Sequence, residues 1–309
     1  MNPNPVTRLT RSMLFVPASR PEMIEKASRS AADAVCLDLE DSVSADEKAA
    51  SRVNVVHALQ TLDFGRRVRM VRINALDTPF AYRDLIDIVE AAGERLDLIM
   101  LPKVTSPADV TFVDTLLSQI EWNRGLSCCI GIEGQIENAR GFLYAREIAA
   151  ASPRLEALIF GPGDFAASMR MPSSGVGEFD EHDELYPGHR WHAVMQTIVA
   201  AARANGLRCM DGPYASYKDA AGFERSCRIA RGMGFDGKQC IHPGQLAMAN
   251  TVFAPSDDEV AKADAVVKAY DAAAAGGQGA AAHGAQMIDM ASIRMARTIL
   301  ERRGLIESA

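Results

Sequence analysis

The sequence has no long hydrophobic run and no surplus of positive charge. None of its 309 residues fall in a stretch that approaches the roughly 18 consecutive apolar residues of a membrane-spanning helix, and the apolar stretch near the N-terminus is too short for a signal peptide. Its 33 basic and 40 acidic residues give a formal charge of −7, which argues against nucleic acid as a partner because phosphate binding requires a basic face. We therefore expect no membrane and no nucleic-acid role.

Cysteine and histidine are scarce, and neither forms a metal-binding pattern. The six cysteines include no CxxC pair, and several lie in apolar runs, which favours buried reduced thiols in a cytoplasmic protein. The six histidines form no HExxH motif, and we interpret their one close pair, His189 and His192, as part of a helix start. The sequence thus gives no support for a zinc site.

A dinucleotide-binding fingerprint is also missing, since no GxGxxG follows the first apolar run. Instead, eight short apolar runs without strict alternation recur along the chain, as parallel strands covered on both sides do. Amphipathic stretches separate them, and eight such units predict an α/β protein built as a TIM (β/α)₈ barrel. The runs cover 12–18, 34–41, 67–74, 96–104, 126–133, 155–164, 207–213 and 235–241.

The pattern changes after the eighth unit. A charged helical stretch covers about 256–275, an Ala/Gly-rich tract follows at 276–285, and a last helix is expected near 292–303. Such a tract is typical of a linker or hinge. We therefore predict a catalytic barrel over 1–255 and, over 256–309, a C-terminal helical extension that acts as a lid.

Polar residues end most of the apolar runs, and the chemistry of a barrel lies at the carboxyl ends of its strands. Several carboxylates and an arginine on different strands, with few competing histidines or cysteines, describe a site for a hard cation such as Mg²⁺. Any single strand-end acid could also cap the next helix, which is how we interpret Glu133 and Asp211. The strand-end residues are Arg20, Asp38, Glu40, Asp41, Arg72, Asn74, Lys103, Glu133, Glu137, Asp164, Asp211 and His242.

At these residues the sequence resembles the HpcH/HpaI aldolase–citrate lyase superfamily, within it the citrate lyase β-like and malyl-CoA/β-methylmalyl-CoA lyase branch. The matching stretches run in order from residue 11 to 296: RSMLFVPASRPEMIEKA, AVCLDLEDSV, VRINALDTP, LIMLPKV, IEGQIENARG, LIFGPGDFAASM, GKQCIHPGQ and GAQMIDMASIRMA. The resemblance implies a carbon–carbon lyase that splits a 3-hydroxyacyl thioester into an acyl-CoA and a 2-oxo acid.

The resemblance also implies roles around a metal ion. Glu137 and Asp164 resemble the protein ligands of Mg²⁺, with Mn²⁺ as an alternative. Arg72 resembles the guanidinium that holds the carboxylate of the oxo acid and the developing oxyanion. Glu40 and Asp41 resemble acids that order metal-bound water. Glu133 lies four residues before Glu137, so a ligand assignment shifted by one helical turn stays open.

Further positions resemble groups that serve the thioester. Arg20 and Lys26 resemble residues that meet the CoA phosphates, and Pro243 lies by the acyl-thioester end. Asp289 resembles a lid aspartate that acts as general acid and base in the site of a neighbouring subunit. The resemblance therefore implies a homo-oligomer, trimer or hexamer, with exchanged lids. The acid and the acyl carrier, CoA or a carrier protein, stay open.

Two other functions compete with the thioester lyase. A class II aldolase acting on free oxo acids would use the metal acids and the arginine, but neither Arg20 and Lys26 nor a lid aspartate. A non-catalytic barrel subunit or ligand-binding scaffold would need none of them, although every site position keeps its functional group.

Overall fold

The computed structural model describes residues 8–172, 175–185, 190–275, 281–283 and 286–308. The chain divides into two compact units, Met1–Thr251 and Val252–Ala309. None of the helices in the described ranges combines the length and the apolar character needed to cross a membrane.

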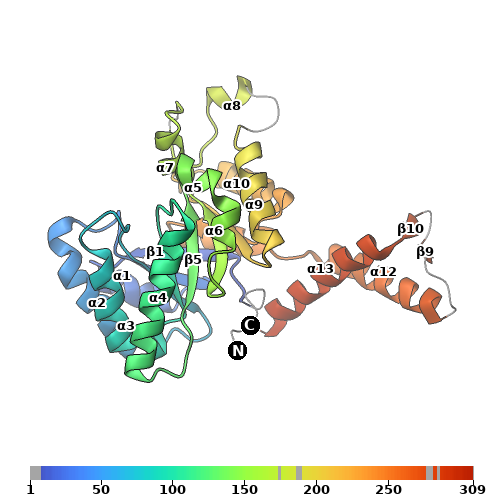
Figure 1. The fold of residues 1–309 in the computed structure, drawn as a ribbon. Helices are drawn as coiled ribbons and strands as arrows, with labels where there is room; N and C mark the ends of the chain where they lie inside the picture. The colour runs from blue at the N-terminus through green and yellow to red at the C-terminus, as the bar shows by residue number, and fades with distance from the viewer. Residues whose placement is uncertain (1–7, 173–174, 186–189, 276–280, 284–285, 309) are drawn as a thin grey trace. The chain divides into compact units, whose positions relative to one another are not determined.

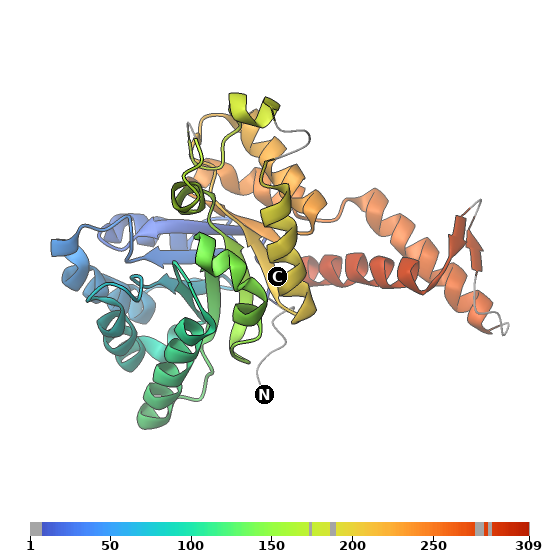
Figure 2. The same ribbon diagram turned by 45° about the horizontal axis from the view of Figure 1, so that its top comes forward.

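The first unit is a closed barrel of eight parallel strands, as predicted. Each strand pairs with the next along the chain, and β8 pairs with β1 through the register Ser12↔Lys238. Helices surround the strands on the outside (Figures 1 and 2). The strands are β1 Ser12–Pro17, β2 Ala34–Asp38, β3 Val68–Arg72, β4 Leu98–Leu101, β5 Gly131–Ile136, β6 Leu155–Phe160, β7 Arg208–Asp211 and β8 Gly237–Cys240.

Several helices of the barrel begin at prolines or capping residues. Pro21, Pro107 and Pro243 each occupy the first helical turn, where a missing N–H costs nothing. Ser106 and Asp109 form a capping box in front of α4. The helices and 3₁₀ turns of this unit are α1 Pro21–Ser28, η2 Ala45–Glu47, α2 Lys48–Thr61, α3 Ala81–Ala92, η3 Gly93–Arg95, α4 Pro107–Arg124, α5 Ala139–Leu143, α6 Ala145–Ala149, α7 Pro162–Ser168, α8 Glu181–Leu185, α9 His192–Ala204, α10 Ala220–Met233, η4 Pro243–Gln245 and α11 Leu246–Val252.

Alternation along the strands separates the barrel core from the site. Buried apolar side chains, among them Met13, Cys36 and Met70, pack together in one core cluster. Successive side chains of a strand point to opposite faces, so the residue two positions further along points the same way. From these three residues that step leads to Phe15, Asp38 and Arg72, which line a cavity at the carboxyl ends of the strands.

The second unit is a helical hairpin. Helix α12 Asp257–Ala275 packs along α13 Met290–Ser308, and strands β9 Ala281–His283 and β10 Gln286–Ile288 pair antiparallel between them. Both predicted C-terminal helices are thus present. Residues 276–280 and 284–285 of the predicted hinge lie outside the described residues, whereas 281–283 form a strand and not the expected linker.

Candidate active site

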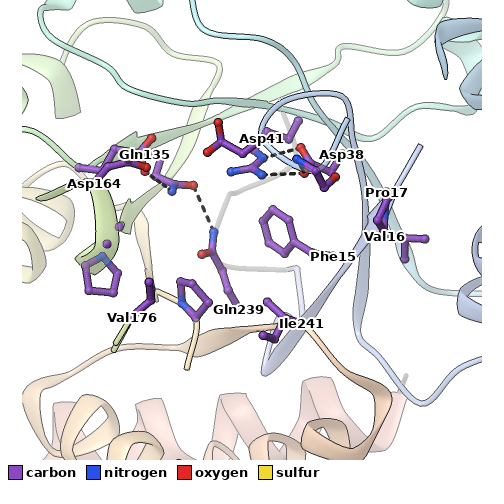
Figure 3. A pocket seen from close by; sticks show the side chains of 17 residues that line it. Phe15, Val16, Pro17, Asp38, Asp41, Gln135, Asp164, Val176, Gln239 and Ile241 are labelled. Atoms are coloured by element: carbon purple, nitrogen blue, oxygen red, sulfur yellow. Dashed lines mark hydrogen bonds and ion pairs between the residues drawn. The ribbon is translucent and has the colours of Figure 1, made fainter. Parts of the chain in front are cut away.

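A cavity of about 430 Å³ opens at the carboxyl ends of the barrel strands. Its charged and amide lining comes from strands and turns far apart in sequence, which the barrel brings together (Figure 3). Apolar side chains, including Phe15, Val176 and Ile241, complete the wall. The charged lining residues are Asp38, Asp41, Arg72, Glu137 and Asp164.

The Arg72 guanidinium is held in one orientation by two buried acids. Its Nε and Nη2 donate to the two carboxylate oxygens of Asp38 at 2.6 and 2.7 Å, and its Nη1 lies 2.8 Å from Glu40 Oε2. The guanidinium carbon Cζ lies over the Phe15 ring, 5.1 Å from its centre. Two of the five guanidinium N–H groups donate hydrogen bonds, and Nη1 also forms the ion pair with Glu40. Among the described residues, each terminal nitrogen therefore keeps at least one N–H for a ligand carboxylate.

The acids that hold Arg72 differ in their electrostatics. Burial disfavours charge on Asp38, but the charge and hydrogen bonds of Arg72 outweigh it and hold the pKa of Asp38 below its usual range. For Glu40 burial wins over Arg72, and the pKa of that carboxyl is raised. Glu40 also lies 2.8 Å from Lys103 Nζ, which is 3.2 Å from Asp41. Glu40 therefore bridges the two cations of the site.

Glu137 is buried, and both of its oxygens accept hydrogen bonds. Oε1 accepts from the backbone N–H of Lys103 at 2.7 Å, and Oε2 accepts from Gln135 Nε2 at 2.6 Å. Lys103 presents that N–H from a left-handed backbone conformation, with φ of 51°, which is strained for a residue with a side chain. Burial and the negative charges of Glu40 and Asp164 raise the pKa of Glu137 to about 8. A nearby cation would relieve this penalty.

The donor set fits Mg²⁺. Asp164 is exposed in the first turn of α7 and lines the same cavity as Glu137. None of the described residues that line the cavity is a histidine or a cysteine. Within the described ranges no three His, Cys, Asp or Glu side chains could hold a metal ion together, which excludes a cage built only from such ligands there. Mg²⁺ commonly takes one or two carboxylates and fills its other positions with water and substrate oxygens.

Gly161 lets the chain pass directly over Glu137. A Cβ at this position would lie 2.5 Å from Glu137 Cβ and 2.6 Å from its Oε2. We expect Gly161→Ala to displace the carboxylate and to weaken Mg²⁺ binding at least about tenfold in calorimetry, a change of roughly 1.4 kcal/mol. Gly232→Ala is the matched control, because a Cβ there meets nothing within 4 Å. Equal Mg²⁺ affinity of both variants would contradict the assignment of Glu137.

The residues predicted to serve the thioester are exposed, unlike Glu137 and Arg72. Arg20 and Lys26 are exposed in the turn after β1 and on α1, and Pro243 is exposed in η4 after β8. None of the three lines the cavity. Asp289, in the second unit, is exposed in front of α13 and accepts hydrogen bonds from the backbone N–H and hydroxyl of Ser292, which lower its pKa. Their functional roles stay predictions.

The alternative assignment of Glu133 is wrong. Glu133 lies in strand β5 and Glu137 follows its end, so the two are not one helical turn apart. Four residues of extended chain separate them by about 13 Å. Glu133 lies inside β5, fully buried, and pairs with Arg208 at 2.8 Å. Asp211 likewise has a structural partner, the buried Lys238.

Four residues of the site received no role from the sequence: Phe15, Asp38, Gln135 and Gln239. Asp38 is directly opposite Arg72 in the β2–β3 register, so strand pairing combined with alternation could have indicated the ion pair. Gln239 donates to Gln135 Oε1 at 3.2 Å. Neutral amides and a single phenylalanine carry no distinctive signal in one sequence.

Comparison with known proteins places the chain in a family. Residues 11–243 match the model of the HpcH/HpaI aldolase/citrate lyase family. The chain belongs to this family. An L-malyl-CoA/β-methylmalyl-CoA lyase of Cereibacter sphaeroides is 45% identical over 100% of this chain and 99% of its own. A (3S)-malyl-CoA thioesterase of the same organism is 38% identical over 94% of each chain.

Among solved structures, this chain is similar to the CitE protein of Mycobacterium tuberculosis in complex with magnesium, acetoacetate and coenzyme A. Its TM-score is 0.76 at 32% identity, with 96% of this chain and 99% of that one covered. The predicted family and the predicted enzyme class, a carbon–carbon lyase, are confirmed.

Proposed function

We propose that the protein is a Mg²⁺-dependent carbon–carbon lyase. It cleaves a 3-hydroxyacyl-CoA thioester into an acyl-CoA and a 2-oxo acid, or forms the thioester from these two compounds. The observation that carries this proposal is the cavity lined by Glu137, Asp164 and Arg72, in which each terminal nitrogen of Arg72 keeps an N–H that no described residue occupies. The lyase of C. sphaeroides and the Mg²⁺- and CoA-bound CitE protein support it by similarity.

Each half of the cavity serves the oxo acid differently. Arg72 binds the carboxylate of the oxo acid, and its ion pairs with Asp38 and Glu40 fix the orientation of the guanidinium. A lysine has no planar group that could bind Asp38 and the substrate at the same time. Glu137 and Asp164 hold Mg²⁺, which as a Lewis acid polarises the carbonyl of the oxo acid when bound. Phe15, Val176 and Ile241 limit the water around the reacting carbon.

The thioester half depends on residues outside the cavity. In this proposal Arg20 and Lys26 bind the CoA phosphates, and Pro243 contacts the acyl end. In the condensation direction Asp289 removes a proton from the carbon next to the thioester carbonyl, and in the cleavage direction it returns that proton. In its exposed position it is a weak base, and only transfer into a less solvated site raises its basicity. We therefore include a homo-oligomer, trimer or hexamer, in which the lid aspartate serves a neighbouring subunit.

Asp289→Asn tests the proton transfer. We expect the variant to bind the oxo acid with wild-type affinity but to exchange the α-protons of acetyl-CoA with deuterium at least about 10²-fold more slowly, the usual contribution of a general base. Ser292→Ala is the matched control, because it removes the hydroxyl that Asp289 accepts from and keeps the carboxylate. Wild-type exchange in Asp289→Asn would exclude the lid base.

The function itself is tested with malyl-CoA, β-methylmalyl-CoA and citramalyl-CoA plus Mg²⁺, with the products identified by mass spectrometry. The proposal requires a free 2-oxo acid together with an acyl-CoA from at least one of them. Free CoA plus the intact hydroxy acid would indicate a thioesterase instead, the activity in the name of the second relative. Cleavage of free hydroxy acids alone would favour the class II aldolase, and no turnover with no Mg²⁺ binding would favour a scaffold.

The cellular location stays a prediction. All six cysteines are free, four of them buried, in keeping with the cytoplasm that the sequence predicts.

A further inference from the structure

We propose that Gln135 and Gln239 form a positioning relay, a chain of two buried amides that fixes the metal-binding carboxylate of Glu137 from β8, three strands away from β5 around the barrel. The relay rests on the proposed function, because it assigns to Glu137 the role of a Mg²⁺ ligand. It concerns two residues that contact neither metal nor thioester in the assignment above.

The barrel brings the three residues together. Gln135 lies on β5 two positions before Glu137, so both side chains point into the barrel mouth. Gln239 reaches the same space from β8. Gln239 Nε2 donates to Gln135 Oε1 at 3.2 Å, and Gln135 Nε2 donates to Glu137 Oε2 at 2.6 Å (Figure 3). All three are at most 4% exposed, so water does not compete effectively for these bonds.

When Glu137 is ionised, as it must be to bind Mg²⁺, its charge determines the direction of the whole chain. An ionised carboxylate only accepts hydrogen bonds, so Gln135 must turn its NH₂ group toward Glu137. Its carbonyl oxygen then faces Gln239, which in turn must present its own NH₂ group. Gln239 itself lines the cavity that holds the acid. A change at Gln239 is thereby transmitted to the metal carboxylate across the mouth of the barrel.

Neutral amides suit this task better than charged donors would. A lysine or arginine in place of Gln135 would form an ion pair with Glu137 and compete with a cation for its charge. An amide fixes the rotation of the carboxylate and leaves that charge for the metal. The second oxygen is fixed in the same way, by the neutral backbone N–H of Lys103. Glu137 is thus oriented on both sides without being neutralised.

Calorimetric titration of Mg²⁺ into substrate-free protein tests the relay. Gln135→Met and Gln239→Met keep the approximate shape of the side chain and remove its amide. We expect Gln135→Met to weaken Mg²⁺ binding about tenfold, because it removes a hydrogen bond to a charged group. Gln239→Met removes a hydrogen bond between neutral amides and should weaken Mg²⁺ binding about fivefold. The double variant should bind Mg²⁺ about as tightly as the single variant with the lower affinity, because both substitutions interrupt one chain.

Gln245→Met is the matched control. Gln245 is 2% exposed at the same end of the barrel, but it donates to the backbone oxygen of Tyr214 and has no bond to the relay. Its loss should lower the melting temperature and leave the Mg²⁺ dissociation constant within twofold of wild type. A Gln239→Met protein with wild-type Mg²⁺ affinity, or single effects that add fully in the double variant, would overturn the relay.

This test also separates the relay from the lyase assignment. If wild type binds Mg²⁺ but cleaves no hydroxyacyl-CoA, the proposed function fails while the titrations still decide the relay. If wild type cleaves the thioester and Gln239→Met binds Mg²⁺ normally, only the relay fails. A kinetic readout adds to this. The activity of Gln239→Met should recover at saturating Mg²⁺ if positioning of Glu137 is the only defect.

Discussion

Glu137→Gln is expected to reduce Mg²⁺-dependent cleavage by about 10³-fold or more, since a catalytic metal contributes several kcal/mol and each 1.36 kcal/mol is tenfold in rate. The substitution keeps the size of the side chain. The amides of Gln135 and Gln239 can both turn over to meet it, because each offers a donor and an acceptor. The fold should therefore persist, as judged by circular dichroism.

The same variant should be more stable than wild type in chelator, and the difference should depend on pH. The pKa of Glu137 rises on folding from an ordinary 4.5 to about 8, mainly because of burial. Between these values the folded protein retains a proton that the unfolded chain has released, so the stability of wild type falls as pH rises through this window. Gln cannot titrate. The melting temperature of Glu137→Gln should therefore exceed that of wild type increasingly from pH 5 to pH 8.

Asp164→Asn provides the comparison. Asp164 is exposed on α7, so its replacement should remove activity to a similar extent with little change in melting temperature. Saturating Mg²⁺ should stabilise wild type but neither variant. Full activity of Glu137→Gln in Mg²⁺ would exclude Glu137 as a metal ligand.

The second large effect is expected for Arg72→Lys, with a loss of about 10²–10³-fold in kcat/KM. A lysine cannot donate to both oxygens of Asp38 and still offer a two-pronged contact to a substrate carboxylate. Weaker pairing of the buried Asp38 should also lower stability. Steady-state kinetics with the oxo acid varied in the condensation direction would measure the first effect, and thermal melting the second.

Arg69→Lys on the same strand is a close control. Arg69 also forms a bidentate pair, with Asp97 at 2.8 and 2.9 Å, but it lines no part of the cavity. It should lose a bidentate ion pair of the same geometry, although a more exposed one, and keep wild-type kcat/KM. If both variants lose activity equally, the effect of Arg72→Lys is structural and Arg72 does not bind the acid.

Most of the fold could be predicted because eight apolar runs and their helices follow a regular order. One of the exceptions is the fifth strand. The fifth strand was expected at 126–133 but occupies Gly131–Ile136. The apolar Cys128–Cys129 pair precedes the strand, while Glu133 and Gln135 inside it are polar and point into the barrel, where Glu133 pairs with Arg208. A rule based on apolar runs cannot place a strand whose inner face is polar.

The site was predicted in part. Arg72, Asp41, Glu137 and Asp164 line one cavity, and Glu40 contacts Arg72. The partners that orient them were not predicted, since the hydrogen bonds of Asp38 and Gln135 depend on which strands are neighbours and on which face each residue occupies. The strained backbone of Lys103 also has no sequence signature, because a lysine in that conformation is exceptional.

The central claim is that Glu137 and Asp164 hold a divalent ion beside the acid-binding guanidinium of Arg72. Anomalous diffraction from crystals grown with Mn²⁺ and glyoxylate tests it most directly. We expect one strong peak between the two carboxylates, with the glyoxylate carboxylate on the terminal nitrogens of Arg72. A peak bound by other residues, or an acid bound away from Arg72, would contradict the account.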